Sequence, residues 1–360
     1  MTGLSSALNH DSHGRLVSII VINHNYGQFV SCAIQSALSQ DYASVEVIVV
    51  DDGSTDDSRD IIASFAGAIK LVLLDHGGHS VAVNAGFSHS TGDMVLFLDA
   101  DDFLRPECIS TAVAEMKSTD VKLQFQLATI DQDGTDQDMI FPYFSPMMSS
   151  DSVHRQALAS AWYPWTVSSG NLFARWYLEE LFPLNTEIVF RSPDSYLNKL
   201  APLYGAVRTL RRVLGAYRVH GRNAWASSPK SWDHMVAVRW LRFDRMLEGE
   251  FLDCAARKGI VTRRPLLPIF HQLEYRALAL RFTAERPIPG DSRASVLLDG
   301  MRWLVHSHPD GVIGSVARIV WLFFVVIAPK KVVEDQIRKA RAQSHRSRFW
   351  KQALRLSRLR

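Results

Sequence analysis

Three aspartates follow directly on a run of apolar residues in the N-terminal half of the chain. The segment Met94–Pro106 reads Met-Val-Leu-Phe-Leu-Asp-Ala-Asp-Asp-Phe-Leu-Arg-Pro and so places Asp99, Asp101 and Asp102 after five apolar residues. Carboxylates this close repel one another unless a cation or hydrogen-bond donors neutralise them. Oxygen ligands favour a hard cation, Mg²⁺ or Mn²⁺, which usually shares its coordination shell with substrate phosphates. The segment therefore indicates a metal–diphosphate site; the alternative is a strand and a turn in which Asp102 caps the next helix.

The apolar run before these aspartates is typical of a strand buried on both faces. Similar runs cover residues 16–23, 45–50 and 69–74, and apolar residues at helical spacing follow each of them. Strand and helix thus alternate four times between residues 16 and 116, which predicts an α/β fold with a mostly parallel twisted sheet flanked by helices. Further segments are predicted as strands over 121–129, 207–210 and 214–219, and as a loop over 131–150.

Polar side chains gather where these strands end, which is where an open α/β sheet binds its ligands. They include Asn23, Asn25, Asp51, Asp52 and Asp99, and a Gly-Gly turn accompanies them. Because the carboxyl ends of parallel strands lie along one edge of the sheet, these groups outline a nucleotide site. The motifs GxGxxG and GxxxxGK[ST] are absent, so neither a dinucleotide-binding fold nor a P-loop has specific support. For the Asp51–Asp52 pair, a tight turn with a helix cap is the alternative.

Three motifs, in this order and spacing, resemble those of the family-2 inverting glycosyltransferases, which have the GT-A fold. They are Val17–Tyr26 (VSIIVINHNY), Val49–Asp56 (VVDDGSTD) and Phe97–Asp102 (FLDADD). The resemblance covers about the first 220 residues. It implies a glycosyltransferase that uses a nucleotide sugar and a divalent cation.

The resemblance also implies roles for individual residues. Those implied to hold the nucleotide are Asn23, Asn25, Asp51, Asp52, Asn84 and Asp99. Those implied to hold Mn²⁺ or Mg²⁺ are Asp101, Asp102 and His220. A carboxylate accepts the N3–H of uracil, whereas N3 of cytosine carries no proton, so the expected donor is a UDP-sugar. The family often has an arginine or a leucine where this chain has Val83. If an arginine there contacts a phosphate, this chain must supply that charge from elsewhere.

Asp194 takes the position of the family's acceptor-activating acid, although Pro193 stands where a second acid is usual. Inverting transfer needs one base to remove the proton of the acceptor hydroxyl, and the resemblance implies that Asp194 is this base. The alternative is an acid at a helix start, favoured by the helix dipole.

The segment Tyr217–Arg222 resembles the closing Tyr-Arg-x-His segment of the family. This resemblance implies that His220 completes the metal shell and that Arg218 or Arg222 contacts the diphosphate. A satisfied polar histidine is the alternative for His220. The long membrane spans of processive polysaccharide synthases are missing, which favours a transferase that adds a single sugar.

Four regions are expected along the chain. They are a flexible N-terminus (1–15), a GT-A nucleotide-sugar-binding and catalytic domain (16–225), a helical region (226–328) and a basic amphipathic tail (329–360). Helices are predicted over 232–250, 265–281 and 293–306. The apolar run 312–328 contains Arg318 and falls short of a comfortable membrane span, so it is either a buried helix or an interfacial one.

Composition and charge limit the possible binding partners and the expected cellular compartment. The three cysteines show no metal-binding spacing and the first fifteen residues are polar, which predicts reduced thiols and no secretory signal. Residues 329–360 hold eleven Lys and Arg against Glu334 and Asp335, a local charge of +9; because the whole chain carries +3, the remainder carries −6. A tail that alternates apolar and cationic residues suits an anionic membrane surface, and a solvated or nucleic-acid-binding tail is the alternative. We expect no nucleic-acid partner and a peripheral location on the cytoplasmic face of the membrane.

These observations combine into one expected function. It is a metal-dependent inverting glycosyltransferase that moves a sugar from a UDP-sugar to a glycolipid or surface-glycan acceptor. A nucleotidyltransferase that makes sugar nucleotides is the enzymatic alternative, but it predicts a Gly-rich basic loop after the first strand, and residues 24–28 offer only His24. A membrane-associated scaffold with a relic nucleotide pocket is the non-enzymatic alternative.

Overall fold

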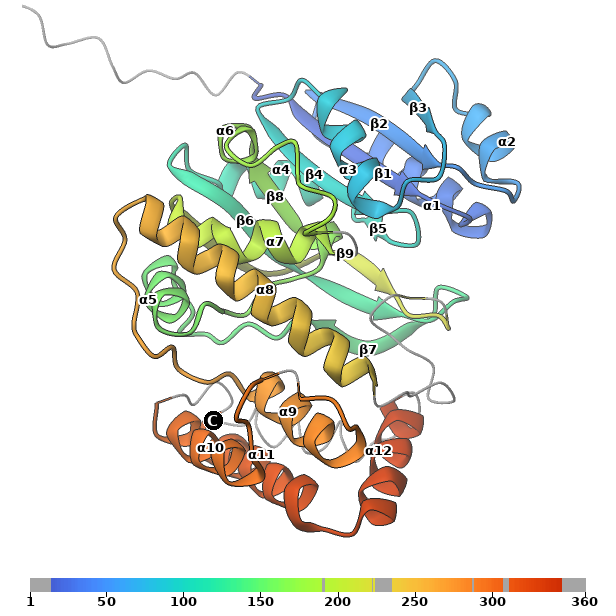
Figure 1. The fold of residues 1–360 in the computed structure, drawn as a ribbon. Helices are drawn as coiled ribbons and strands as arrows, with labels where there is room; N and C mark the ends of the chain where they lie inside the picture. Colours follow the sequence, from blue (N-terminus) through green and yellow to red (C-terminus); the bar gives the residue numbers. More distant parts are fainter. Residues whose placement is uncertain are drawn as a thin grey trace, which may run out of the picture.

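The computed structural model describes residues 14–189, 192–221, 223, 235–286, 288–306 and 311–344 (Figure 1). Within these residues nine strands form one sheet in the order β3-β2-β1-β4-β8-β6-β9-β5, and β7 pairs with β6 outside this path. The strands are β1 Val17–Asn23, β2 Val45–Asp52, β3 Lys70–Leu74, β4 Met94–Asp99, β5 Phe103–Leu104, β6 Asp120–Ile130, β7 Asp136–Phe141, β8 Asn171–Ala174 and β9 Ala206–Arg218.

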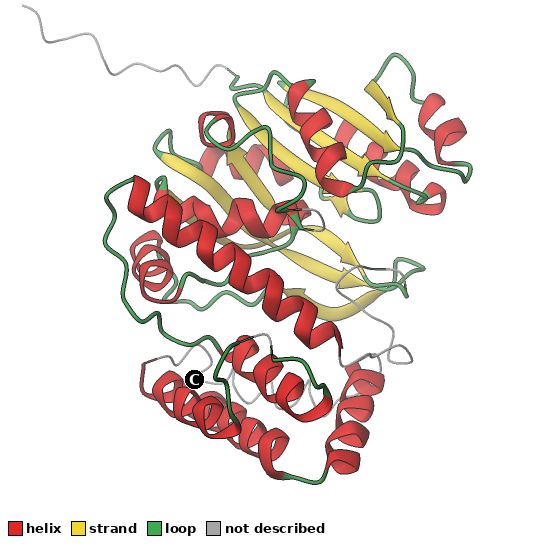
Figure 2. Cartoon of the chain, viewed as in Figure 1, coloured by secondary structure: helices red, strands yellow, loops and turns green. Residues whose placement is uncertain are grey.

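Helices cover both faces of the sheet and form a separate layer near the C-terminus (Figure 2). They are α1 Gly27–Leu38, α2 Ser58–Ala63, α3 His79–Ser88, α4 Cys108–Glu115, α5 Ser150–Ser160, α6 Arg175–Glu179, α7 Pro193–Leu200, α8 Met235–Arg257, α9 Phe270–Phe282, α10 Arg293–His306, α11 Gly311–Ile327 and α12 Lys330–Ser344. Two short 3₁₀ turns, η1 Ser168–Gly170 and η2 Ala201–Leu203, connect elements of the second half of the sheet.

The first four strands confirm the predicted parallel sheet. β1 pairs in parallel with both β2 and β4, and β2 pairs in parallel with β3. Successive apolar residues of β1 point to opposite faces: Ile20 and Ile22 join the core under α3, whereas Ile19 and Val21 join the core under α1 and α4. This alternation explains why β1 is a continuous apolar run, because both of its faces are covered. It also places the carboxyl ends of β1, β2 and β4 on one edge of the sheet.

The second half of the sheet differs from the prediction in two places. The segment 131–150, expected as a loop, contains β7, which pairs antiparallel with β6. The two short strands expected over 207–210 and 214–219 are one strand, β9, which follows β6 in parallel with shifts in register near Phe125 and Gln126. Arg211 and Arg212, which interrupt the apolar pattern, fall within this strand and are exposed there. The interruption marks an irregular part of the pairing and not a chain reversal.

The C-terminal helices pack on the sheet through α8. Its second half places Phe251, Cys254 and Ala255 in the core on the α3 side of the sheet, so its packing crosses the boundary expected at residue 225. α8 also continues to Arg257, beyond the expected end at residue 250. Helices α9 to α12 share an apolar core that is separate from the two cores on the faces of the sheet. Helix α10 has the bounds that the sequence predicted. Among the described helices, none is both long enough and apolar enough to cross a membrane.

Candidate active site

A cavity of about 290 Å³ opens at the carboxyl ends of β1 and β4. This is the place where the strand order reverses, since β2 lies on one side of β1 and β4 on the other, and open α/β sheets bind ligands at such a point. Its lining brings together Asp52, Asp99, Asp101 and Asp194, which the sequence predicted as site residues. These four carboxylates come from the ends of β2 and β4, from the turn after β4 and from the start of α7.

The turn after β4 divides its three aspartates between two environments. Asp99 ends the strand and lines the cavity, and the Asp102 backbone N–H donates to its carbonyl oxygen, which closes the turn at 3.0 Å. The Asp102 carboxylate points inward and is buried. It accepts hydrogen bonds from Ser169 Oγ (2.6 Å) and from the Arg218 backbone N–H (2.9 Å). Asp102 therefore ties the turn to η1 and β9 and is absent from the cavity lining, although the sequence predicted it as a metal ligand.

Asp101 lines the cavity, and hydrogen bonds from neighbouring side chains fix the position of its carboxylate. His220 Nε2 lies 2.8 Å from Asp101 Oδ2, and Asn223 Nδ2 donates to the same oxygen at 3.4 Å. The rings of Tyr26 and Phe29 pack on the imidazole of His220, with centroids 5.4 and 5.3 Å away. The structure thus brings the predicted pair Asp101 and His220 together. The sequence analysis did not identify Asn223.

Asp194 reaches the cavity from the N-terminal turn of α7, which begins with Pro193. Its carboxylate accepts a hydrogen bond from Ser192 Oγ at 2.6 Å. Lys122, a fully buried residue of β6, anchors the helix to the sheet. Its Nζ donates to Asn198 Oδ1 on α7 and to Asn171 Oδ1 on β8. Burial lowers the pKa of Lys122 well below its ordinary value. This lysine fixes the register of α7 against the sheet and hence the place of Asp194.

The electrostatics of the cavity reflect its crowded acids. Burial raises the pKa of Asp99 well above its ordinary value, and the neighbouring charges of Asp101 and Asp194 raise it further. Tyr217 also lines the cavity. Burial raises its pKa, and the negative charges of Asp102, Asp101 and Asp99 raise it further, so its hydroxyl keeps its proton. Such mutual repulsion is the condition that a bound cation relieves.

The donor set in this part of the cavity fits a divalent cation. Carboxylate oxygens of Asp99 and Asp101 face the cavity, and an imidazole stands next to them. Hard oxygen donors with room for further ligands are what Mg²⁺ and Mn²⁺ prefer in proteins. The hydrogen bonds of the Asp101 side chain within the described residues are made by Oδ2. Asp99 and Asp101 are accordingly the residues that could supply oxygen ligands to an ion. His220, which the sequence predicted as a metal ligand, is absent from the cavity lining, and its Nε2 is engaged with Asp101.

The end of β2 presents a different arrangement of acids. Asp51 is fully buried and accepts from Asn23 Nδ2 (2.8 Å), from the Ser54 backbone N–H (3.1 Å) and from Arg59 Nε (2.8 Å). Burial alone would raise the pKa of Asp51, but Arg59, Ser54 and Asn23 together bring it below its ordinary value. Asn25, at a positive φ of 55°, accepts from the Thr55 backbone N–H. The predicted nucleotide residues Asn23, Asn25 and Asp51 thus lie together, but they shape the loop and do not line the cavity.

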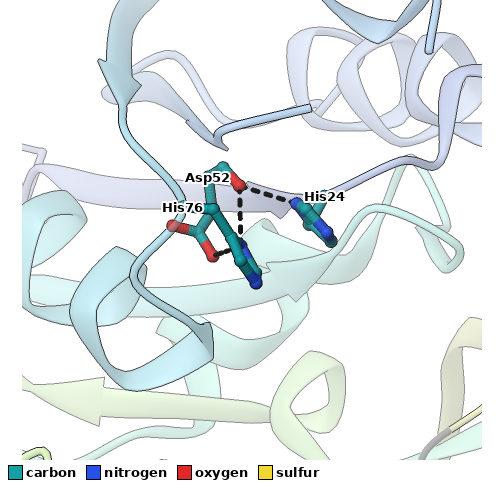
Figure 3. A group of neighbouring side chains, drawn as sticks. All are labelled: His24, Asp52 and His76. Carbon is teal, nitrogen blue, oxygen red and sulfur yellow. Dashed lines mark hydrogen bonds and ion pairs between the residues drawn. The ribbon is translucent and has the colours of Figure 1, made fainter. Parts of the chain in front are cut away.

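Asp52 does line the cavity, between two histidines (Figure 3). Its carboxylate accepts the backbone N–H groups of Gly77 and Gly78, both at 2.8 Å. Nδ1 of His24 and Nδ1 of His76 lie 2.6 and 3.2 Å from the Asp52 carbonyl oxygen. A carbonyl oxygen only accepts, so each Nδ1 carries the proton and each Nε2 is left with a lone pair. The two imidazoles stack with their centroids 4.1 Å apart.

His24, Asp52 and His76 also form a group that could hold a metal ion by distance alone. Each Nε2 keeps a lone pair that an ion could use, but the two rings are stacked with their centroids 4.1 Å apart, and this stacking favours a different role. The stacked rings instead form a flat wall at the β2 end of the cavity. The sequence analysis assigned no role to His76.

His79 is a further cavity residue that the sequence analysis did not assign. It begins α3, its Nε2 lies 3.8 Å from Asp99 Oδ1, and within the described residues this buried nitrogen has no hydrogen-bond partner. Burial lowers its pKa, against the raising influence of Asp194, Asp101 and Asp52. An unpaired imidazole nitrogen facing the cavity is available to a ligand. A histidine next to a Gly-Gly turn was the sequence signal that could have found it.

Two further predicted site residues, Asn84 and Arg218, do not line the cavity. Asn84 exchanges hydrogen bonds with the backbone of Leu184 (2.9 and 2.8 Å) and anchors α3 to the segment before α7. The guanidinium of Arg218 donates to the carbonyl oxygens of Asp101 and Gln132, so it braces the turn after β4 and does not face a diphosphate. Arg222 lies outside the described residues.

Comparisons with known proteins bear on the same part of the chain. The model of the family described as glycosyl transferase family 2 matches residues 18–159, which include β1, β2, β4 and the turn after β4. An uncharacterized glycosyltransferase of Nostoc sp. (strain PCC 7120), alr2836, is 35% identical over 229 residues, which are 61% of this chain and 70% of that protein. The Escherichia coli enzyme WfaP, named a UDP-Glc:alpha-D-GlcNAc-diphosphoundecaprenol beta-1,3-glucosyltransferase, is 31% identical over 121 residues, 33% of this chain and 48% of WfaP.

A solved structure supports the fold over nearly the whole length. The structure of S. aureus TarS 1-349 in complex with UDP superposes with a TM-score of 0.51 at 18% identity and covers 91% of both chains. This likeness includes the curled, mostly parallel sheet, its flanking helices and the C-terminal helices. The family match, the relatives and the fold agree with the resemblance seen in the motifs. The chain therefore belongs to glycosyl transferase family 2 and is a glycosyltransferase with the GT-A fold.

Proposed function

We propose that this glycosyltransferase is a metal-dependent inverting enzyme that transfers a sugar from a UDP-sugar to a lipid-linked or surface-glycan acceptor. One observation carries the proposal: Asp52, Asp99, Asp101 and Asp194, from three separate segments, converge on one cavity at the switch point of the sheet. Asp52 lies at a wall suited to a nucleobase. Asp99 and Asp101 lie at the proposed cation site, and Asp194 lies at the start of α7.

The β2 end of the cavity is proposed to take the uracil ring. The stacked imidazoles of His24 and His76 offer a flat face to an aromatic base, and Asp52 supplies a carboxylate next to them. A carboxylate accepts the N3–H of uracil. WfaP is named as an enzyme that uses UDP-Glc, and the TarS structure contains UDP, which supports a uridine donor.

The β4 end is proposed to take the diphosphate. When bound there, Mn²⁺ or Mg²⁺ would neutralise the negative charge that develops on the leaving group. Asp99 and Asp101 would hold the ion, while His220 and Asn223 keep the Asp101 carboxylate in place. The unpaired Nε2 of His79 faces the same space. It would supply the polar contact to a phosphate that Val83 cannot make.

Asp194 is proposed to be the general base. The acceptor hydroxyl oxygen forms a bond to the anomeric carbon from the face opposite the diphosphate, and the bond from that carbon to the diphosphate oxygen breaks with its electron pair leaving on UDP. The hydroxyl proton passes to the Asp194 carboxylate. Ser192 Oγ, which donates to this carboxylate, orients it. A single displacement inverts the anomeric centre.

An acceptor with an apolar part is supported by the rim next to the cavity. Phe141, at the end of β7, packs on the Tyr217 ring with centroids 5.8 Å apart, and Tyr217 lines the cavity. Met139, Ile140 and Tyr143 are exposed large apolar residues on the same rim. Together with the basic tail, this rim favours an acceptor presented at an anionic, cytoplasmic membrane surface, where we place the enzyme as a peripheral protein.

The proposal is tested by measuring nucleotide release from a panel of UDP-, GDP- and CMP-sugars with Mn²⁺, Mg²⁺ or EDTA. We expect slow hydrolysis of one or more UDP-sugars that needs the divalent cation. Equal rates in EDTA would contradict the cation site, and a preference for CMP-sugars would contradict the role given to Asp52. With an acceptor identified, NMR of the product is expected to show an inverted anomeric configuration.

A further inference from the structure

Apart from Ser315, which is buried, and Arg318, whose guanidinium lies over the Phe270 ring, helix α11 is apolar on all sides, but the protein covers only one of them. Its inner side places Ile319, Leu322, Val325 and Val326 in the core of the C-terminal helices, each at most 6% exposed. Its outer side carries Val312, Ile313, Val316, Val320 and Ile327, each between 44 and 87% exposed. These five recur at the spacing of one helix face. A helix that is apolar all round is normally buried all round, so the outer side lacks its expected cover.

Helix α10 continues this surface. Leu298, Met301 and Val305 are between 45 and 70% exposed and lie opposite its buried residues. The two helices pack closely through Gly300, where an added Cβ would stand 2.8 Å from Leu322 Cδ2. In Figure 1 both helices lie at the end of the molecule farthest from β3. We call these eight residues, three on α10 and five on α11, the α10–α11 apolar face.

A surface of this kind calls for a partner. Soluble proteins rarely expose contiguous apolar patches of more than a few hundred Å², and larger patches mark protein or membrane interaction sites. None of the eight side chains carries a hydrogen-bonding group, which suits hydrocarbon. The face is therefore more apolar than the usual protein interface, whose core alternates with polar groups.

The surrounding charges identify the partner. Arg302, on α10, and Lys330 and Lys331, which begin α12, are exposed close to the face in sequence. Residues 329–360 as a whole carry a charge of +9. A second copy of the chain docked on this face would bring two such clusters together and be repelled, whereas an anionic bilayer would attract them.

We propose that the α10–α11 apolar face is a membrane-docking surface that inserts into the interfacial region of an anionic bilayer, with α11 lying in the plane of the membrane. Apolar side chains enter the acyl boundary while the neighbouring lysines and arginines meet the lipid headgroups. The inference deepens the proposed membrane-associated acceptor, because it names the surface that brings the enzyme to the membrane. It predicts a contact that depends on α11 and not on the tail charges alone.

The test compares the full chain with the double variant Ile313→Gln/Val320→Gln in flotation with vesicles of phosphatidylcholine and phosphatidylglycerol. Both positions are exposed, so the change is not expected to disturb packing. Two apolar side chains withdrawn from the membrane should lower vesicle partitioning about tenfold or more, at low and at high salt. The matched control is Val261→Gln, since Val261 is 87% exposed, like Ile313, but lies outside the face. The control should bind as the wild type does.

A second measurement reports contact directly. In a Cys32→Ser background, which leaves only the buried Cys108 and Cys254, a polarity-sensitive dye is attached through Ile313→Cys or, as the control, Val261→Cys. We expect a blue shift on adding anionic vesicles for the first label and none for the second. Equal vesicle binding by the double variant and the Val261→Gln control, or no shift at residue 313, would overturn the proposal.

Two further readings separate this inference from its alternatives. Analytical ultracentrifugation without vesicles should show the same mass for wild type and double variant; an assembly that the double variant dissociates would show that a second copy covers the face and would overturn the proposal. Hydrolysis of the donor without vesicles should be unchanged in the double variant. Failure of the proposed function would appear in that hydrolysis, whereas failure of the docking surface would appear only in the vesicle experiments.

Discussion

The ends of β2 and β4 carry similar sequences and behave in opposite ways. At the end of β2, Asp51 is surrounded by donors and its pKa lies below the ordinary value. At the end of β4, Asp99 faces other carboxylates and its pKa lies well above the ordinary value. These two strand ends lie on the same edge of the sheet, with β1 between them. One contains an acid that hydrogen-bond donors stabilise as a carboxylate, and the other an acid that neighbouring carboxylates destabilise. The comparison teaches that neighbouring carboxylates in a sequence indicate a cation site only where the fold leaves them without the hydrogen-bond donors that would stabilise their charge.

The largest expected effect follows from removing a carboxylate at the β4 end. Asp101→Ala should abolish transfer, because the cation site retains too few protein ligands once this carboxylate is lost. The fold should persist, since Asp102 still ties the turn to η1 and β9. Transfer rates and circular dichroism check both parts. An active Asp101→Ala enzyme would break the distinction between the two strand ends.

The next effect concerns the base. Asp194→Asn keeps the shape of the side chain but cannot accept the proton of the acceptor hydroxyl. The turnover rate should fall by about 10² to 10⁴-fold, the usual contribution of a general base, while UDP and Mn²⁺ binding stay near the wild-type values. Single-turnover kinetics and UDP titrations separate the two quantities. Near-normal transfer would assign the base to another group.

At the β2 end the expected loss is one of stability. Asp51→Asn replaces a buried acceptor of three hydrogen bonds by an amide, and should lower the free energy of unfolding by about 1.5 to 3 kcal/mol. Because the folded pKa of Asp51 lies below its unfolded value, its contribution is fully present above the unfolded value of about 3.8 and is lost as the pH falls through the folded pKa. Denaturant unfolding at neutral and acid pH measures this change. Asp60→Asn, on the exposed side of α2, serves as the control and should change little.

The smallest effect has the opposite sign. The folded pKa of Asp99 is raised, so in metal-free protein this group lowers stability as the pH rises from its unfolded pKa towards its folded pKa. Asp99→Asn should therefore raise the melting temperature of the EDTA-treated protein at neutral pH by a few degrees, and should reduce the further rise that Mn²⁺ gives to the wild type. Thermal melts with and without Mn²⁺ show both changes. A lower melting temperature in EDTA would mean that Asp99 is satisfied after all.

The sequence predicted the sheet and the acids of the site, and the structure shows why it predicted no more. Apolar runs and their spacing are local, so β1, β2 and β4 and their terminal aspartates could be recognised directly. The inward turn of Asp102 depends on Ser169 Oγ, 67 positions away, and the position of Arg218 depends on carbonyl oxygens 86 to 117 positions away. Such donors and acceptors become neighbours only in the fold.

The same limit applies outside the site. Residues 312–328 are almost entirely apolar apart from Ser315 and Arg318, so their sequence does not distinguish the side of α11 that packs on Gly300 from the side that is exposed. β7 was missed because Gly134 and Pro142 at its ends are typical of loops, whereas its pairing with β6 is non-local. The roles of His76 and His79 were missed because histidine spacing alone does not show which nitrogen is left without a partner.

The position of the cation tests the central claim most directly. A crystal structure with Mn²⁺ and UDP, with anomalous data collected at the manganese edge, locates the ion without assumptions about the ligands. The account predicts one anomalous peak within coordination distance of Asp101 at the end of β4, with the uracil against His24 and His76. A peak between His24 and His76 at the end of β2, with none beside Asp101, would contradict it.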